Sequence, residues 1–152
     1  MKNFFLPYKE VKSLRQVSFS VLEEFRQEIG ETSFKRCQYV LEENERVRQT
    51  EEAFRDGNLK ALGELMYASH RSLSEDYEVS SKELDILVNL AAEAEVEGAR
   101  MTGAGFGGCT VNLVKKGKVD KFVADIKEKY RENTGIEAEV YVSNPGDGAR
   151  KF

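Results

Sequence analysis

Histidine, cysteine and proline are scarce in this sequence of 152 residues, which has one histidine, two cysteines, two prolines and no tryptophan. Cys37 and Cys109 lie far apart, so they cannot form the framework of a disulfide-rich domain. With a single histidine they cannot complete a zinc site either. Pro7 and Pro145 lie near the two ends, and nothing between them has the composition of a linker. We therefore expect one domain over residues 1–152.

An excess of positive charge is also missing, since 23 Lys and Arg face 27 Asp and Glu and the formal net charge is −4. Proteins that bind nucleic acids usually carry a basic patch, so we expect no nucleic-acid partner. The longest uncharged run, residues 101–114, is glycine-rich and too short to span a membrane. Phe4-Phe5-Leu6 is stopped by Pro7 and is too short for the core of a signal peptide. These absences favour a cytoplasmic protein with no membrane contact.

The first two thirds of the chain have the spacing of amphipathic helices. Apolar residues recur every three or four positions, or every seven in the case of Val40, Val47 and Phe54. The pattern predicts helices over residues 19–29, 33–54, 59–73 and 80–96. Ser80 followed three residues later by Glu83 is typical of a capping box, and Gly98 is expected to end the last of these helices. We expect residues 1–96 to be mainly helical.

The period then changes, and residues 97–152 are expected to form a strand, a loop, a second strand, a helix and a third strand. The strands are predicted over residues 99–102, 109–114 and 136–142, and the helix over 119–130. Cys109, Val111 and Leu113 alternate in the second strand and are expected to face the core. A helical block before such a tail indicates an α+β fold, with helices packed on one face of the sheet.

A glycine-rich loop joins the first two predicted strands and is the most informative segment of the chain. Glycines allow positive φ and keep Cβ atoms away, so successive N–H groups can point into one concavity that suits phosphate oxygens. Arg100, Lys115 and Lys116 are expected to add positive charge nearby. The alternative is a flexible hairpin whose glycines only relieve crowding. The candidate binding residues are Gly103, Ala104, Gly105, Phe106, Gly107 and Gly108.

Three common glycine motifs do not fit this loop. Gly103, Gly105 and Gly108 have the spacing of a dinucleotide fingerprint, but that motif opens a helix and here a strand follows. A Walker A loop needs Gly-Lys-Ser or Gly-Lys-Thr, whereas Gly108 is followed by Cys109. A protein-kinase glycine loop does lie between two strands, but the V-A-I-K, H-R-D and D-F-G motifs of that family are absent.

Arg100–Cys109, with the sequence RMTGAGFGGC, resembles the third signature motif of galactokinases, which belong to the GHMP superfamily of small-molecule kinases. Other stretches resemble the same family in the same order along the chain. They are Val11–Arg15, Glu42–Val47, SHRSL at Ser69–Leu73, DYEVS at Asp76–Ser80, Glu83–Asp85, and the closing Asp147-Gly148-Ala149. Together the resemblance covers about residues 6–151.

The resemblance implies a ferredoxin-like β-sheet and a role in the ATP-dependent phosphorylation of galactose at its anomeric hydroxyl. The loop 103–108 would form one wall of the nucleotide cleft, with ATP and Mg²⁺ as the cofactors of the full enzyme. In galactokinases the sugar motif, the serine-rich phosphate loop and the catalytic aspartate belong to an N-terminal half, which this sequence lacks. We therefore expect no catalytic residue and no metal ligand here, a kinase half as partner in the same polypeptide or a separate chain, and no activity of this chain alone.

A stand-alone module on a ferredoxin-like scaffold, with a regulatory role or binding a small anion, is the alternative function. The resemblance further predicts an exposed apolar patch where the N-terminal half would dock. Phe106 either fills an apolar gap under the loop or lies against the partner half. Tyr141 points away from the predicted row of Val140 and Val142, which leaves it open to an interface.

Four further residues invite a chemical role, but structural roles are expected for them. His70 is the only histidine and is expected to pack or hydrogen-bond between helices rather than act as a general base. Asp76 is expected in a polar turn, and Asp85 in the first turn of a helix, where the helix dipole favours an acid. Cys109 is expected to be a small core residue rather than a reactive thiol.

Overall fold

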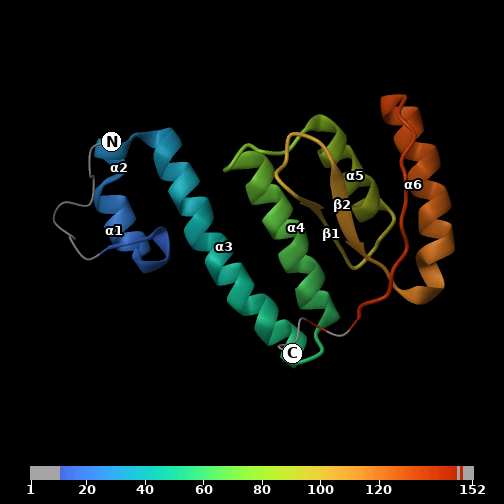
Figure 1. Cartoon of the computed structure of the whole chain (residues 1–152), viewed down its shortest axis with the longest axis horizontal. Helices are drawn as coiled ribbons and strands as arrows, with labels where there is room; N and C mark the ends of the chain where they lie inside the picture. Colours follow the sequence, from blue (N-terminus) through green and yellow to red (C-terminus); the bar gives the residue numbers. More distant parts are fainter. Residues whose placement is uncertain (1–10, 147, 149–152) are drawn as a thin grey trace.

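The computed structural model describes residues 11–146 and residue 148, and it consists of a helical block followed by a β-hairpin and a last helix (Figure 1). This order confirms the predicted α+β class. Asp147 and Ala149 of the closing motif lie outside the described residues. The elements are the 3₁₀ turn η1 (Leu14–Gln16), α1 (Phe19–Glu24), α2 (Arg26–Ile29), α3 (Glu31–Arg55), α4 (Leu59–Glu75), α5 (Lys82–Glu93), β1 (Gly98–Thr102), β2 (Cys109–Leu113), the 3₁₀ turn η2 (Lys116–Lys118) and α6 (Val119–Thr134).

The helices α3 and α4 form a long hairpin, with α1 and α2 packed beside the first part of α3 (Figure 1). The chain turns from α2 into α3 at Gly30, whose φ is 77°, a value that glycine adopts without strain. At the other end, the side chain of Asn58 caps α4 by accepting the N–H of Ala61 at 3.0 Å. The helices predicted from apolar spacing are all present, although the first is broken into α1 and α2.

The start of α5 differs from the predicted capping box. Ser81, not Ser80, is the N-cap, and its Oγ accepts the N–H of Leu84 at 3.3 Å. The Ser80 hydroxyl donates instead to Asp85 at 2.6 Å, so it is not available to cap the helix. Because either of two adjacent serines suits an N-cap, the sequence pattern did not distinguish them.

Gly98 is not a helix breaker, because α5 already ends at Glu93 and Gly98 is the first residue of β1. Its role is close packing between β1 and α4. A Cβ built on Gly98 would lie 2.6 Å from the Cα of Gly63 in α4, and one on Gly63 would lie 1.6 Å from the carbonyl oxygen of Glu97. The pair of glycines therefore lets helix and strand approach at backbone distance, which sets the position of the hairpin on the helices.

The two strands are antiparallel, and their register decides which side of β2 is covered. Residues directly opposite each other share a face, and Met101 pairs with Thr110 while Arg100 pairs with Val111. Met101 is 1% exposed and belongs to the same buried cluster as Leu73 of α4 and Leu84 of α5. Thr110 therefore shares the covered face, and Val111, 47% exposed, lies on the open one. The expectation that Cys109, Val111 and Leu113 face the core was wrong for Cys109 and Val111, which are exposed, whereas Leu113 is half-buried.

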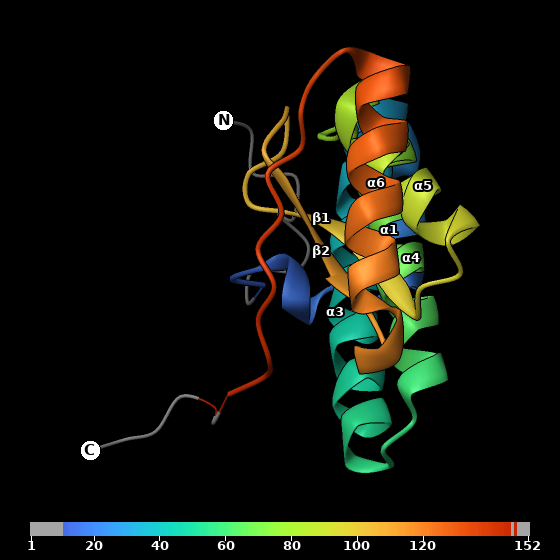
Figure 2. The ribbon, with the colours of Figure 1, turned by 90° about the vertical axis from the view of Figure 1, so that its right-hand side faces the viewer.

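The predicted third strand over residues 136–142 is absent from the described residues, where the sheet consists of β1 and β2 only. This segment passes beside α6 without strand pairing (Figure 2). Ala138 and Val140 are half-buried against the α5–α6 core, whereas Ile136 and Val142 are exposed. Apolar and polar residues alternate in this segment because one side of it packs against the core. Such alternation does not reveal whether a neighbouring strand is available to pair with the segment.

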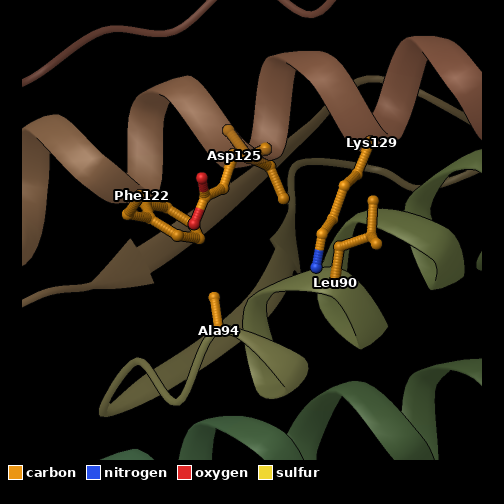
Figure 3. A pocket seen from close by; sticks show the side chains of 6 residues that line it. Leu90, Ala94, Phe122, Asp125 and Lys129 are labelled. Carbon is orange, nitrogen blue, oxygen red and sulfur yellow. The ribbon is translucent and has the colours of Figure 1, made fainter.

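Among the described residues, buried apolar side chains form three clusters. Apolar side chains fill the space between α5 and α6, where Leu90 and Ala94 face Phe122 across a small hollow (Figure 3). A second cluster joins α1 to α3 around Leu22 and Phe34. The third lies between α3, α4, α5 and β1 and includes Leu73, Leu84 and Met101. This last cluster supports the start of the glycine-rich loop.

Candidate functional site

The glycine-rich loop over residues 103–108 joins β1 to β2 and has a backbone that few sequences could adopt. The φ angles are 88° at Gly103, 88° at Gly105, 60° at Phe106, 127° at Gly107 and 105° at Gly108. All five lie in the region that favours glycine, and phenylalanine adopts it only at a cost of about 1–3 kcal/mol. The four glycines are therefore required by the path of the chain.

The loop is held at its middle by the segment before α5. The amide of Phe106 donates to the carbonyl oxygen of Val79 at 2.7 Å. A Cβ on Gly105 would lie only 2.1 Å from that same oxygen, so no other residue fits there without displacing one backbone from the other. At Gly103, Gly107 and Gly108 a Cβ would meet nothing within 4 Å. Crowding therefore explains one glycine, and backbone conformation explains the rest.

Most amides of the loop are left without a protein acceptor. Among the described residues, the Phe106 amide is the only one of the six that donates a hydrogen bond within the chain. The amides of Gly103, Ala104, Gly105, Gly107 and Gly108 are free, and the loop is exposed or half-exposed along its length. A group of free N–H donors on an exposed glycine loop can bind an anion such as a phosphate.

The segment Asp76–Ser80, which holds the loop, is itself fixed to α3. The guanidinium of Arg36 donates to the carbonyl oxygen of Asp76 and pairs with the carboxylate of Glu78, whose pKa it lowers. The rings of Tyr39 and Tyr77 stack with their centroids 4.5 Å apart. Asp76 therefore lies in a turn, as expected, and its backbone rather than its carboxylate makes the contact. No pattern in the sequence indicated that this turn supports the glycine loop.

The buried His70 and the half-exposed Asp85 form a polar cluster below the loop. The Nδ1 atom of His70 accepts the N–H of Met101 at 3.2 Å, and Nε2 lies 3.2 Å from Oδ1 of Asp85. Burial lowers the pKa of His70, and Asp85 opposes this shift. Asp85 also accepts hydrogen bonds from Ser74 and Ser80. His70 is thus a hydrogen-bonding residue between elements, as expected, but Asp85 does more than complement the helix dipole.

The basic residues expected near the loop are paired or distant. Arg100 lies 3.4 Å from Glu43, which also accepts the hydroxyl of Ser69 at 2.7 Å, so its charge is compensated. Lys115 pairs with Glu97 at 2.7 Å, at the end of the hairpin opposite the loop. Lys116 follows it in η2. The prediction that these two lysines lie near the glycines was wrong, because β2 carries the chain about 17 Å away from them.

Phe106 and Tyr141, whose roles the sequence left open, and Cys109, which was predicted to lie in the core, are all exposed. Phe106 is 75% exposed, so it fills no apolar gap under the loop. Cys109 is an exposed free thiol, and its predicted place in the core was wrong because it shares the open face of β2 with Val111. Tyr141 is 84% exposed, and its hydroxyl donates to Glu139 at 2.9 Å. Phe106 in the loop and Val111 on the open face of β2 are thus two exposed apolar side chains.

Other features of the described part of the chain are weaker candidates for a functional site than the loop. No group of three or more His, Cys, Asp or Glu side chains lies close enough there to hold a metal ion. None of the helices that the structure describes is both long and apolar enough to pass through a membrane. The hollow between α5 and α6 in Figure 3 and a groove of about 440 Å³ between α3 and α4 both lie away from the loop. The loop amides are therefore the best candidate site.

Comparison with known proteins agrees with the motifs. Residues 50–132, more than half of the chain, match the family model described as GHMP kinases C terminal. Galactokinase of Clostridium acetobutylicum is 43% identical over 146 residues, which make up 95% of this chain and 38% of that protein. Galactokinase of Bacillus subtilis is 46% identical over 124 residues, or 81% of this chain and 32% of that protein.

A solved structure matches the fold as well. The crystal structure of Lactococcus lactis galactokinase complexed with galactose superposes with a TM-score of 0.85 at 40% identity, covering 95% of this chain and 38% of that one. These matches confirm the resemblance that the motifs indicated. The chain spans less than two fifths of the length of each of these relatives.

Proposed function

This chain belongs to the family of GHMP kinase C-terminal domains, and on that basis we propose that its glycine-rich loop forms one wall of the nucleotide site of a galactokinase-type enzyme. In this reaction the γ-phosphate of ATP is transferred to the anomeric hydroxyl of galactose. The observation that carries the proposal is the set of five loop amides without a protein acceptor. The proposal implies an enzyme of the cytoplasm, where ATP is available.

The loop suits a nucleotide phosphate because its attraction is local. A chain with a net charge of −4 has no general attraction for an anion, and the guanidinium of Arg100, three residues before the loop in the sequence, is compensated by Glu43. Backbone N–H groups carry no counter-charge and can approach phosphate oxygens where glycines leave the backbone bare. Backbone amides do not titrate near neutral pH, so binding through them does not depend on the protonation state of a side chain. Phosphoryl transfer depends mainly on such positioning and on stabilising the charge of the phosphoryl group.

The proposal includes a partner, the N-terminal kinase half, in the same polypeptide or in a separate chain. That half would supply the sugar site, the serine-rich phosphate loop and the catalytic aspartate, as the resemblance implies. We assign no residue of this chain to Mg²⁺, since no suitable cluster occurs in the described part. The exposed side chains of Phe106 and Val111 offer an apolar surface for docking, next to the loop. A stand-alone anion-binding module is not favoured, because galactokinases match this chain over nearly its whole length.

Activity of the chain with and without the missing half tests the proposal. We expect the 152-residue protein alone to give no ATP-dependent phosphorylation of galactose above a Gly105→Glu control. Addition of a separately produced N-terminal half of a bacterial galactokinase should restore turnover. In the mixture, Gly105→Ala should lower the rate by an order of magnitude or more, because its Cβ would meet the Val79 carbonyl at 2.1 Å.

Gly117→Ala is the matched control for that substitution, since Gly117 in η2 has no atom within 4 Å of an added Cβ and needs no positive φ. It should leave the rate of the mixture unchanged. Turnover by the chain alone, or equal rates for Gly105→Ala and the original chain, would contradict the proposal.

A further inference from the structure

The carboxylate of Asp85 connects three side chains from different parts of the fold. Its Oδ1 accepts the hydroxyl of Ser80 at 2.6 Å and lies 3.2 Å from Nε2 of His70. Its Oδ2 accepts the hydroxyl of Ser74 at 3.1 Å. Ser74 and His70 lie on α4, whereas Ser80 lies in the segment before α5. The carboxylate can hold its three partner side chains in place, because hydrogen bonds to a charged group are stronger than hydrogen bonds between neutral groups.

Two of these contacts lead to the glycine-rich loop. His70 accepts the amide of Met101 through Nδ1. In the neutral ring Nε2 then carries the proton and donates it to Asp85. Met101 lies in β1, two residues before Gly103. This contact therefore fixes the strand from which the loop begins.

The second contact of Asp85 that bears on the loop is its hydrogen bond with Ser80. The residue before it, Val79, accepts the amide of Phe106 at 2.7 Å at the middle of the loop. With Ser80 bound to Asp85, the peptide unit between Val79 and Ser80 is fixed, and its carbonyl oxygen points at the loop. The hydroxyl of the third partner, Ser74, has its one hydrogen bond among the described residues with Asp85. Val79 is also held through its own amide, which donates to the backbone carbonyl oxygen of Leu73 in α4 at 3.0 Å, and this bond does not involve the Ser74 side chain.

We propose that Asp85 is a positioning residue for the glycine-rich loop: through His70 it holds the strand that enters the loop, and through Ser80 it holds the carbonyl group that anchors the loop's middle. Whether this positioning of the loop matters for phosphoryl transfer rests on the proposed function. The positioning itself is a property of this chain and can be measured without any nucleotide.

Ser74 and Ser80 give a matched pair of variants. Each donates one hydroxyl to the same carboxylate, and both are half-buried, so Ser74→Ala and Ser80→Ala should lower the overall stability by similar amounts. Only Ser80→Ala should free the loop. The reporter is the amide of Phe106, whose hydrogen exchange can be followed by NMR relative to amides in α4. Exchange at Phe106 should accelerate roughly fivefold in Ser80→Ala, the equivalent of one ordinary hydrogen bond, and should not change in Ser74→Ala.

Two further variants complete the experiment. Ser80→Thr retains a hydroxyl and should restore slow exchange at Phe106. Asp85→Asn should accelerate exchange at both Phe106 and Met101, because both paths begin at the carboxylate. Equal exchange at Phe106 in the Ser74 and Ser80 variants, or no change in Asp85→Asn, would overturn the proposal. A titration of the same samples with Mg·ATP keeps the two claims apart, since failure to bind nucleotide would count against the proposed function alone.

Discussion

At the scale of single residues, the candidate site depends on contacts with residues that lie outside it. Gly105 could be identified from the sequence as part of a glycine-rich loop, but the reason for it is the carbonyl oxygen of Val79, which lies 26 residues earlier in the chain. No local pattern reports such a contact. The loop was predictable because glycines are required locally by its φ angles, whereas its anchor was not, because the anchor depends on tertiary packing.

His70 provides a pH-dependent test of the cluster below the loop. Burial lowers its pKa in the folded chain, with a further lowering by Arg100 and an opposing effect of Asp85. In the unfolded chain histidine titrates near its ordinary pKa of about 6.5. The unfolded state therefore binds more protons as the pH falls through this range, and the free energy of unfolding should decrease from neutral pH toward about pH 5.

The measurement is denaturant unfolding at a series of pH values between about 5 and 7, a range in which most carboxylates remain ionised. Because the chain has one histidine, the effect can be assigned to it. His70→Asn is the control, since its amide oxygen can still accept the N–H of Met101 but the side chain does not titrate. The account is contradicted if that variant shows the same pH dependence as the original chain.

At the scale of elements, the helices were predictable and the faces of the strands were not. The amphipathic pattern of α4 and α6 is local, and burial of Phe122, Ile126 and Tyr130 in α6 follows from it directly. Alternation in β2 also separates two faces, but it does not say which one the helices cover. That choice is made by the register with β1, whose Met101 is buried. The third predicted strand failed for a related reason, since a strand needs a partner that its own sequence does not contain.

Substitutions on the two faces of β2 test this assignment. Val111→Lys should change the melting temperature little, because Val111 is on the open face and surface substitutions usually shift stability by less than about 0.5 kcal/mol. Thr110→Lys should lower it clearly, because Thr110 lies opposite the buried Met101 and a lysine there would place a charge against the helices. Thermal unfolding of both variants measures the difference. The reverse order of stability would show that the covered face is the other one.

At the scale of the whole molecule, the open face of the sheet and the glycine-rich loop both suit a role as one wall of a site shared with another part of an enzyme. The chain spans 38% of the length of the Clostridium acetobutylicum galactokinase that it matches. An apolar residue exposed on the sheet, an exposed Phe106 and five free amides are together the features expected of one wall of a shared site. None of them requires a titratable group in this chain.

NMR titration of the chain with Mg·ATP shows whether the amides of the glycine-rich loop bind nucleotide phosphates. Even weak binding at millimolar nucleotide should shift the amide signals of Gly103, Gly105, Gly107 and Gly108 most, with small changes at Lys115 and Lys116 at the far end of the hairpin. The same shifts should appear with inorganic triphosphate. Shifts centred on the lysines, or an absence of shifts at the four glycines when the N-terminal half is also present, would contradict the account.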